Sequence, residues 1–372
     1  MIERLTLGNF KSIKEKDFDL ENLSLLSGLN GMGKSSIIQS LLLLRQSYEK
    51  HLLPNSGISL TGDYVSIGTG SDLLFSDAND EKICIEVYTD DSELKLPLQY
   101  MESSDHLPIN KDEFLCSGKP FETSLFSNSF QYLSADRISP KSTYSISDHA
   151  VNTRRFLGIK GEYTAHFIAE HGSSKLAIAK LNHPSATSNE LAANIDAWMS
   201  DITPGTRVNA KVIREINQAS LHYQFSTSSE MTKPFRPENT GFGLTYVLPV
   251  VTAVLSAKKG DLLIIENPES HLHPAGQTIV AKLFSIAASE GVQIIVETHS
   301  DHFLNGVRRS IKNGIISNDD ACAYFMSRDK DCKEHSVEIK RVQFRPEGKM
   351  NEWPDGFFDE WDKSLNDLIG DI

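Results

Sequence analysis

The sequence predicts an α/β fold built around parallel strands, and three observations support that prediction. A glycine-rich loop stands between an apolar strand, expected at 22–27, and a helix, expected at 36–48. Two further apolar runs, 261–266 and 292–297, show no polar alternation, which is typical of parallel strands covered on both faces. Helical patterns surround these runs, so this part of the chain is expected to alternate helix and strand.

The loop GLNGMGKSS, residues 28–36, matches the pattern GxxxxGK[ST] in full. Glycines let successive backbone N–H groups curve around phosphate oxygens, and the following helix N-terminus adds partial positive charge. The lysine reaches the β- and γ-phosphates, and the next hydroxyl binds Mg²⁺. A glycine turn that only opens a core helix would not require the complete pattern. We therefore expect an ATP and Mg²⁺ site formed by Gly28, Asn30, Gly31, Gly33, Lys34, Ser35 and Ser36, with Ser35 on the metal.

The run LLIIENPESHLHP, residues 262–274, ends an apolar strand in an acid, Glu266. In an open α/β sheet, ligands bind beyond the carboxyl ends of the strands. Glu266 and the segment ETHS at 297–300 are therefore expected to converge on the same phosphate. We assign Glu266 to Mg²⁺, because a register that makes it the base would place Ile265 at the metal.

The residue after this acid is Asn267, where many ATP-hydrolysing folds have a Glu that polarises the attacking water. An amide can orient a water but cannot accept its proton. Glu269, past Pro268, is the carboxylate left to act as base. An equally open alternative is that Glu269 stabilises the N-terminus of a helix starting near Pro274. Hydrolysis is thus expected to be slow.

Histidines near these motifs allow a different interpretation, in which they bind a catalytic metal as in a metallohydrolase. The order of the motifs and the helix start explain them without a second metal, so the ATP site is favoured. The residues in question are His271, His273, His299, Asp301 and His302.

Four segments in order, GLNGMGKSS, TGFG, LLIIENPESHLHP and THSDH, resemble the phosphate loop, signature segment, acidic strand and switch histidine of ABC-type ATPase heads. Three others, IERLTLGNFKSI, YLSADRISP at 132–140 and WPDGFFDEW at 353–361, resemble more closely a bacterial group of AAA-annotated ATPases. That group is related to the chromosome-maintenance and overcoming-lysogenization-defect ATPases and is frequently encoded in phage-defence operons. The resemblance covers both ends and most of the second half of the chain.

The resemblance implies an ABC-type P-loop ATPase head with a mixed sheet, an antiparallel first-lobe sheet, a helical and hairpin insertion, and a small C-terminal α+β addition. His299 would be the switch histidine at the γ-phosphate. Thr240 and Gly241, in the signature segment NTGFG at 239–243, would cap the γ-phosphate bound by a second subunit. Gln131 would be the glutamine that links the lobes.

Function also follows from the resemblance. It implies a homodimer that closes around two ATP molecules and regulates a separate effector in anti-phage defence. Too few residues follow His299 to hold a fused nuclease domain, so a nuclease effector would be another polypeptide. The competing interpretations are an ATP-dependent scaffold without hydrolysis and a DNA-repair ATPase that binds nucleic acid directly. For Arg137, binding a phosphate and pairing with Asp136 or another acid are both open.

Four regions are expected along the chain. They are ATPase lobe I at 1–150, an insertion at 151–235, ATPase lobe II at 236–340 and an aromatic-rich C-terminal segment at 341–372. Strands are expected near 2–7, 17–27, 83–89 and 129–134, and a half-exposed hairpin at 207–216 and 219–228. Helices are expected over NELAANIDAWMSDI, with Leu191, Ile195, Trp198 and Ile202 on one face, and over 356–368.

The C-terminal rings, Trp353, Phe357, Phe358 and Trp361, are expected to form one cluster. Anchoring of the last helix to the core is favoured over a docking surface for a partner.

Bulk properties limit the partners. With 37 Lys plus Arg against 50 Asp plus Glu, the net charge of −13 is opposite to that of a typical phosphate-backbone binder. No apolar run approaches the roughly 20 residues of a membrane span, and the N-terminus shows no secretory signal, so a cytoplasmic location is expected. The scattered cysteines, Cys84, Cys116, Cys322 and Cys332, are expected to be free thiols.

Overall fold

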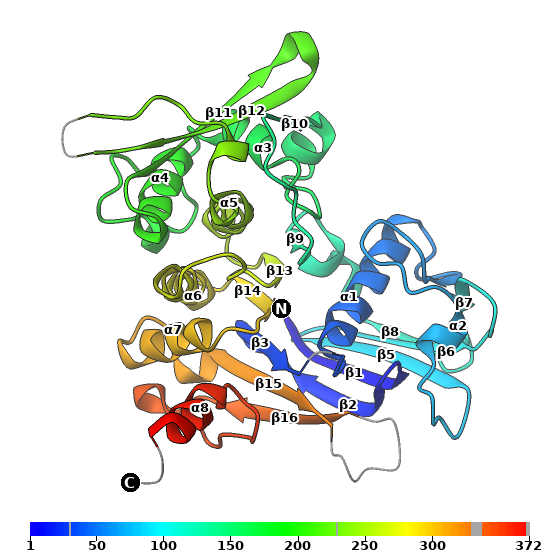
Figure 1. The fold of residues 1–372 in the computed structure, drawn as a ribbon. Coiled ribbons are helices and arrows are strands. Elements are labelled where there is room, and N and C mark those ends of the chain that lie inside the picture. Colours follow the sequence, from blue (N-terminus) through cyan, green and yellow to red (C-terminus); the bar gives the residue numbers. More distant parts are fainter. Residues whose placement is uncertain (30, 228–229, 329–336, 370–372) are drawn as a thin grey trace. The chain divides into compact units, whose positions relative to one another are not determined.

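The computed structural model describes residues 1–29, 31–227, 230–328 and 337–369, without the side chains of 360–363. Asn30 and Cys332 therefore lie outside the described residues, as does the side chain of Trp361. The chain forms two compact units (Figure 1). Unit 1 comprises 1–127, 322–343 and 350–372, and unit 2 comprises 128–321 and 344–349.

Unit 1 contains an antiparallel sheet with the strand order β2-β1-β5-β6-β8. Alternate side chains, such as Ile83, Ile85 and Val87, are buried because successive residues of a strand point to opposite faces. The antiparallel first-lobe sheet predicted from the sequence is thus confirmed. The strands are β1 (Ile2–Phe10), β2 (Ile13–Asp19), β5 (Lys82–Thr89), β6 (Glu93–Gln99) and β8 (Leu115–Ser117).

Three other strands, β16 (Glu338–Gln343), β15 (Ala321–Ser327) and β3 (Leu23–Gly28), are neighbours in that order. Helix α1 (Lys34–Glu49) follows β3 and is buried over most of its surface, including its apolar residues at 37–38 and 41–44. The single strand predicted over 17–27 is wrong, because the chain turns between β2 and β3.

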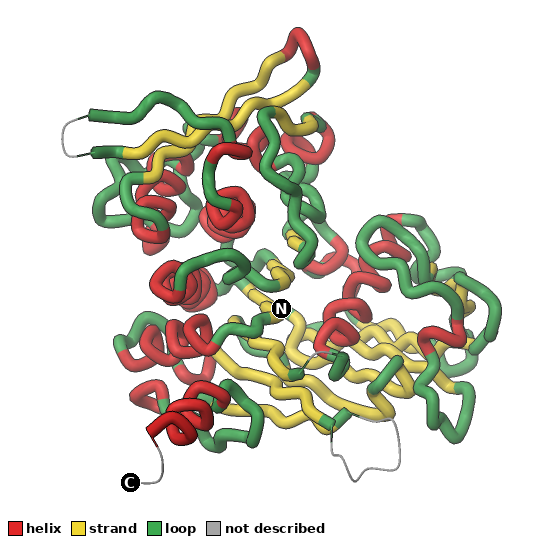
Figure 2. The backbone as a smooth tube through the Cα atoms, viewed as in Figure 1, coloured by secondary structure: helices red, strands yellow, loops and turns green. Residues whose placement is uncertain are grey.

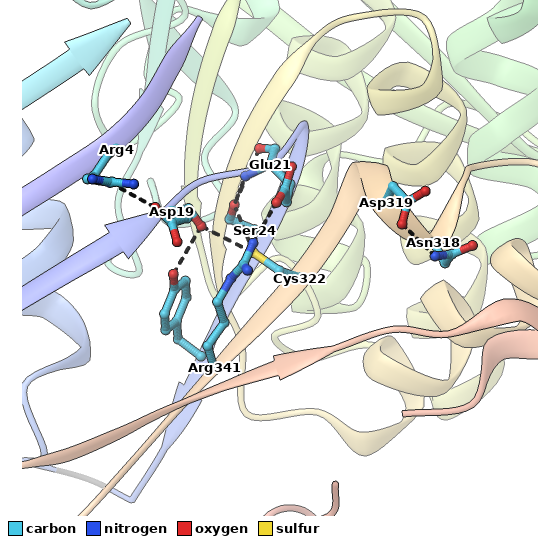
Figure 3. Close-up of polar contacts among 9 residues, drawn as sticks. Arg4, Asp19, Glu21, Ser24, Asn318, Asp319, Cys322 and Arg341 are labelled. Atoms are coloured by element: carbon cyan, nitrogen blue, oxygen red, sulfur yellow. Dashed lines mark hydrogen bonds and ion pairs between the residues drawn. The ribbon is translucent and has the colours of Figure 1, made fainter. Parts of the chain in front are cut away.

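The turn between β2 and β3 is tied to β15 and β16 by a small polar network (Figure 3). The thiol of Cys322 donates to Ser24 Oγ at 3.5 Å and to the Asp19 carbonyl at 3.8 Å. Arg341 pairs with Glu21 at 2.5 Å. Burial raises the pKa of the Cys322 thiol, so this cysteine is a packing residue here.

The remaining elements of unit 1 are short, apart from the last helix. A two-stranded ladder joins β4 (Gly57–Ser59) to β7 (His106–Pro108), and α2 is a single turn, Gly70–Leu73. Helix α8 (Glu360–Ile369) begins four residues later than predicted. Left-handed backbone at Gly356 and Phe358 prevents an earlier start.

The C-terminal aromatic residues pack onto β15. The Phe357 ring is fully buried, with its centroid 5.3 Å from that of Phe325. Trp353 and Phe358 lie against Phe357, with ring centroids at 5.7 and 4.9 Å. These rings therefore anchor the segment before α8, which is the interpretation that the sequence favoured.

In unit 2, β14 (Gln293–Glu297), β13 (Leu262–Glu266) and β9 (Phe130–Leu133) lie side by side in that order and are all parallel. Glu266 is in register with Glu297, so both strands end in an acid at the same edge. All other residues of β13 and β14 are buried, as predicted for strands covered on both faces.

Helices α5 (Phe242–Ser256), α6 (Pro274–Ser289) and α7 (Asp301–Lys312) alternate with these strands. A second, antiparallel sheet of this unit has the strand order β10 (Thr143–Ser145), β12 (Gln218–Phe225) and β11 (Thr206–Ile213). Strands β11 and β12 form the long hairpin seen in Figure 2. Helices α3 (Thr164–His171) and α4 (Leu191–Ile202) pack near this sheet. The predicted apolar face of α4 is buried. β11 ends three residues earlier than predicted because a tight turn at Arg214–Asn217 reverses the chain. β12 also ends three residues earlier, at Phe225, which pairs with the first residue of β11, Thr206. No helix within the described ranges is long and apolar enough to cross a membrane.

Candidate functional site

The phosphate loop of unit 1 depends on two glycines for its packing. At Gly28, φ is 147° and a Cβ would lie 2.2 Å from the carbonyl oxygen of Met326. At Gly33, φ is 80° and a Cβ would lie 2.5 Å from Ser12 Oγ. Gly31 also has a positive φ, of 76°, but its Cβ position faces open space. The loop therefore packs tightly at both ends and is accessible in the middle.

Helix α1 begins directly after this loop and has no side-chain cap. Its first residue, Lys34, is only 4% exposed, and Nζ donates to the carbonyls of Gly28 at 2.9 Å and Leu29 at 2.8 Å. Ser35 is exposed on the first turn, whereas Ser36 is buried. An uncapped helix N-terminus beside a lysine fits a phosphate group, because the first backbone N–H groups have no partner in the helix.

Sequence reasoning missed a residue next to the phosphate loop. Ser12, in the turn between β1 and β2, has a buried hydroxyl that makes no hydrogen bond to any described residue and lies close to the Cβ position of Gly33. The neighbouring Lys11 donates to Gln39 on α1 at 2.8 Å. The segment GNFKSI, residues 8–13, contributes to the family resemblance, but no local pattern in it predicts that Ser12 lies against the loop.

At the edge of unit 2 where β13 ends, both oxygens of the Glu266 carboxylate accept hydrogen bonds. Tyr132 OH donates to Oε1 at 3.0 Å and the Ala135 N–H donates to Oε2 at 2.9 Å. Burial and the adjacent Glu266 charge raise the pKa of Tyr132, so its hydroxyl stays a donor. Each carboxylate oxygen retains a further lone pair, so Glu266 is chemically suited to ligate Mg²⁺.

Asn267 turns the chain out of β13 in a left-handed conformation, with φ 44°. Its N–H donates to the Glu297 carbonyl at 2.8 Å, while its buried Oδ1 has no hydrogen-bond partner among the residues that the structure describes. The turn brings Glu269 back toward the strand ends rather than out into solvent.

Glu269 is 8% exposed, and Oε1 accepts the His299 main-chain N–H at 2.8 Å. Oε2 is buried with no partner at hydrogen-bond distance among the described residues, although the nearby Thr298 hydroxyl also lowers the pKa of Glu269. Burial raises the pKa of Glu269, and the hydrogen bond from His299 partly opposes that effect. The alternative role as helix cap is wrong, because His273 caps α6 by accepting the Ala275 N–H at 3.3 Å.

The His299 side chain follows β14 and is 41% exposed, with Nε2 3.9 Å from Glu297 Oε1. Ser300 next to it caps α7 by accepting the Phe303 N–H at 2.9 Å. Among residues 1–29, 31–227, 230–328 and 337–369, no three His, Cys, Asp or Glu side chains form a group suited to a metal ion. Because β13 and β14 end in register and His299 contacts Glu269, the exposed His299 ring lies at the same edge as Glu266 and Glu269.

A protein-family model described as AAA domain, putative AbiEii toxin, Type IV TA system, matches residues 23–305. The chain belongs to this AAA-domain family. A second model, described as a protein of unknown function (DUF3696), matches residues 316–368. A comparison with curated proteins gives no significant match.

Solved structures similar to this AAA-domain protein include an SmcHead bound to the C-winged helix domain of ScpA. The identity is 15% and the TM-score 0.55, with 92% of this chain and 98% of that chain covered. An Smc head domain with an extended coiled coil, bound to the C-terminal domain of ScpA and derived from Pyrococcus furiosus, has 14% identity, a TM-score of 0.51 and 99% coverage of both chains. The fold of the AAA-domain protein is thus the mixed α/β fold of an ABC-type ATPase head.

The segment at 239–243, which the resemblance implies to be the signature segment, leads into α5 of this AAA-domain protein in unit 2. Thr240 donates its hydroxyl to the Pro237 carbonyl at 2.9 Å, and Gly241 precedes an α5 N-terminus that has no side-chain cap. A Cβ at Gly241 would meet no atom within 4 Å. The N-terminus of α5 is therefore accessible to another molecule.

Two sets of predicted residues are each brought together within one unit of the AAA-domain protein. Gly28, Gly31, Gly33, Lys34, Ser35 and Ser36 form the loop in unit 1, and Glu266, Asn267, Glu269 and His299 lie at one edge of the strands in unit 2. Gln131 differs, because its amide bonds to the backbone of Arg155 and Leu157 in the interior. Membership of an ATPase family implies that nucleotide binds with a divalent metal.

Proposed function

We propose that this AAA-domain protein binds ATP with Mg²⁺, hydrolyses it slowly, and uses ATP-dependent homodimer closure to regulate a separate effector in anti-phage defence. Lys34 carries the proposal. A lysine ammonium held inside a glycine loop, next to an uncapped helix N-terminus, provides charge and directed N–H donors for a polyphosphate.

The proposed reaction is the attack of water on the γ-phosphorus. The bond from that phosphorus to the β,γ-bridging oxygen breaks, ADP and phosphate leave, and the water gives a proton to Glu269. Bound Mg²⁺ would neutralise charge on the phosphate oxygens, with Ser35 and Glu266 as its protein ligands. His299 would contact the γ-phosphate through its exposed imidazole.

Slow turnover follows from the residues at the edge of β13. Asn267 supplies an amide that cannot accept a proton. Glu269 is a possible acceptor because its pKa is raised, but its position is restrained by burial and by the His299 N–H. Phosphoryl transfer depends mainly on positioning and charge neutralisation, so loss of an ideal base slows hydrolysis without abolishing it.

The dimer and effector parts of the proposal rest on the signature segment. Thr240 and Gly241 stand at an accessible helix N-terminus, which would cap the γ-phosphate bound by a second copy. The similar Smc head structures were each solved with a domain of ScpA bound, which is consistent with a head that acts through a protein partner.

A second candidate function is a scaffold that binds ATP without hydrolysing it. Asn267 favours it, as does the burial of Glu269, since neither side chain is a freely accessible base. In that case ATP binding alone would close the dimer.

Single-turnover hydrolysis with Mg²⁺ tests the proposal. The wild type would be compared with Lys34→Ala, Glu266→Gln and Glu269→Gln, and with Lys312→Ala as a surface control. Turnover that requires Lys34 and Glu266, but not Lys312, supports the ATPase. Tight ATP binding without turnover by the wild type favours the scaffold, and absence of ATP binding contradicts both.

A further inference from the structure

Arg137 is a large, charged side chain that is only 2% exposed. It follows β9 in unit 2, in the connection that also supplies the Ala135 N–H to Glu266. Removing a guanidinium from water costs several kcal/mol unless hydrogen bonds and nearby charges compensate. The partners of Arg137 therefore indicate what this buried cation does.

The guanidinium binds backbone rather than a carboxylate. Its Nη1 donates to the Asn267 carbonyl at 2.9 Å, and Nη2 donates to the Glu266 carbonyl. These two successive carbonyls stand where β13 ends and the left-handed turn begins. Asp136 pairs with Lys160 at 2.5 Å, so the sequence-based alternative of an Arg137–Asp136 pair is wrong.

Charge around Arg137 is balanced by two acids of the same loop. Burial lowers the pKa of the Arg137 guanidinium to about 10, while the carboxylates of Glu269 and Glu266 act in the opposite direction. Reciprocally, the Arg137 charge opposes the burial that raises the pKa of Glu269. The cation is thus coupled to both acids that the proposed reaction uses, although it makes its hydrogen bonds to the main chain.

Three buried polar atoms in this region have no partner at hydrogen-bond distance within the described part of the chain, namely Arg137 Nε, Asn267 Oδ1 and Glu269 Oε2. Such atoms are rare in native interiors, and each one needs a reason such as a catalytic role or an ordered water. The set combines one donor with two acceptors. These atoms therefore mark a polar environment around the turn at Asn267.

The geometry points to Arg137 as a positioning residue for the proposed ATPase, which holds the turn at Asn267 so that Glu266 and Glu269 keep the places required for turnover. This inference rests on the proposed function. It predicts that turnover and ATP affinity respond differently to a change at Arg137. The two hydrogen bonds of Arg137 go to the loop that carries the acids, within unit 2, and not to the phosphate loop in unit 1.

A lysine cannot replace this arginine in kind. The planar guanidinium donates to two carbonyls at once in a fixed fork, whereas an ammonium is a point charge on a flexible stem. Arg137→Lys therefore keeps the positive charge but removes the simultaneous hydrogen bonds to the carbonyls of Glu266 and Asn267. Arg155→Lys is the matched control, since Arg155 lies in the same unit and places its guanidinium over the Phe167 ring.

The test measures three quantities on the full chain for wild type, Arg137→Lys and Arg155→Lys. These are the dissociation constant for ATP, the single-turnover rate constant, and hydrogen exchange of the backbone amides of 262–275. For Arg137→Lys we expect ATP affinity within about 3-fold of wild type. We expect a rate constant lower by about 10- to 100-fold, the effect of misplacing reacting groups by an ångström.

Hydrogen exchange reports the position of the loop without any turnover. The amides of Asn267, Ser270 and His299 are bonded within or against the loop, to Glu297 O, Asn267 O and Glu269 Oε1. Exchange at 262–275 should be faster in Arg137→Lys and unchanged in Arg155→Lys. Arg137→Ala supplies a second variant, whose rate constant should recover in part when methylguanidinium is added.

Different results would contradict the positioning role of Arg137 and the proposed ATPase function. A wild type without Lys34-dependent turnover contradicts the proposed ATPase, while the exchange comparison still decides whether Arg137 holds the loop. Lys34-dependent turnover with an unchanged rate constant in Arg137→Lys overturns the inference and leaves the ATPase intact. Global unfolding of both Arg137 variants also overturns it, because Arg137 would then support the core rather than this loop.

Discussion

The main-chain N–H of His299 donates to Oε1 of Glu269 at 2.8 Å. The residue after one strand thereby fixes the carboxylate that follows the neighbouring strand, and the ring of His299 remains 41% exposed. The segment after β14 is therefore linked to Glu269 through its main chain and not through the histidine ring.

Glu269→Gln should change how stability depends on pH. The raised pKa means that the folded protein binds the Glu269 proton more tightly than the unfolded chain does. The contribution of Glu269 to stability is therefore greatest below its ordinary pKa of about 4.3, and falls as pH rises through the raised value. The melting temperature of Glu269→Gln relative to wild type should accordingly rise between pH 4 and pH 7. A difference independent of pH would contradict the inferred cost of ionising Glu269.

Gly28→Ala should be far more damaging than Gly31→Ala. The added Cβ at Gly28 meets the Met326 carbonyl oxygen at 2.2 Å, whereas at Gly31 it meets nothing. Both positions have positive φ, so Gly31→Ala isolates the backbone cost, about 1–2 kcal/mol. Gly28→Ala should lose at least about 3 kcal/mol of unfolding free energy in urea titrations. Equal losses would mean that β3 and β15 do not approach closely at Gly28.

Gly241→Glu should abolish ATP-dependent dimerisation and leave the fold intact. Gly241 has φ −63° and open space around its Cβ position, so a side chain fits there. A carboxylate at the α5 N-terminus would occupy the place proposed for a phosphate, and its favourable interaction with the helix dipole adds about 0.3–1 kcal/mol of stability. Light scattering with and without ATP measures the dimer. An ATP-induced dimer in this variant contradicts the signature role.

Phe357→Ala should destabilise unit 1 by about 3–5 kcal/mol, because a fully buried ring against Phe325 is removed. Leu368→Ala is the control from the same segment, since Leu368 is 85% exposed and should cost less than about 0.5 kcal/mol. Chemical denaturation of both variants distinguishes them. Similar small losses would show that the aromatic cluster does not anchor the segment.

Local patterns predicted the elements that carry the site. The strands ending at Glu266 and Glu297 are continuous apolar runs, and the loop before Lys34 is a complete motif, so each is recognisable without tertiary information. Strand β6 was missed because Pro97 lies inside it and a proline argues against a strand. Its neighbour β8 pairs only with residues 93–95, so the proline is tolerated.

The surroundings of the site residues were not predictable in the same way. Burial of Arg137 depends on carbonyls 129 and 130 positions away in the sequence. The anchoring of Glu269 by His299 similarly spans 30 positions. Such contacts arise from packing between distant segments, and no spacing rule within a helix or strand encodes them. The sequence could therefore name Glu269 as the candidate base but could not show that it is buried.

Lys34 in this structure is bound by its own loop, because the carbonyls of Gly28 and Leu29 already accept its ammonium protons. A ligand that binds the Lys34 ammonium must therefore replace these two hydrogen bonds with hydrogen bonds of its own. Monoanions and nucleosides offer little in return, whereas a triphosphate offers several charged oxygens at once. If ATP binds here as proposed, these two internal bonds would favour ligands with several phosphates over ligands with one, whatever base they carry.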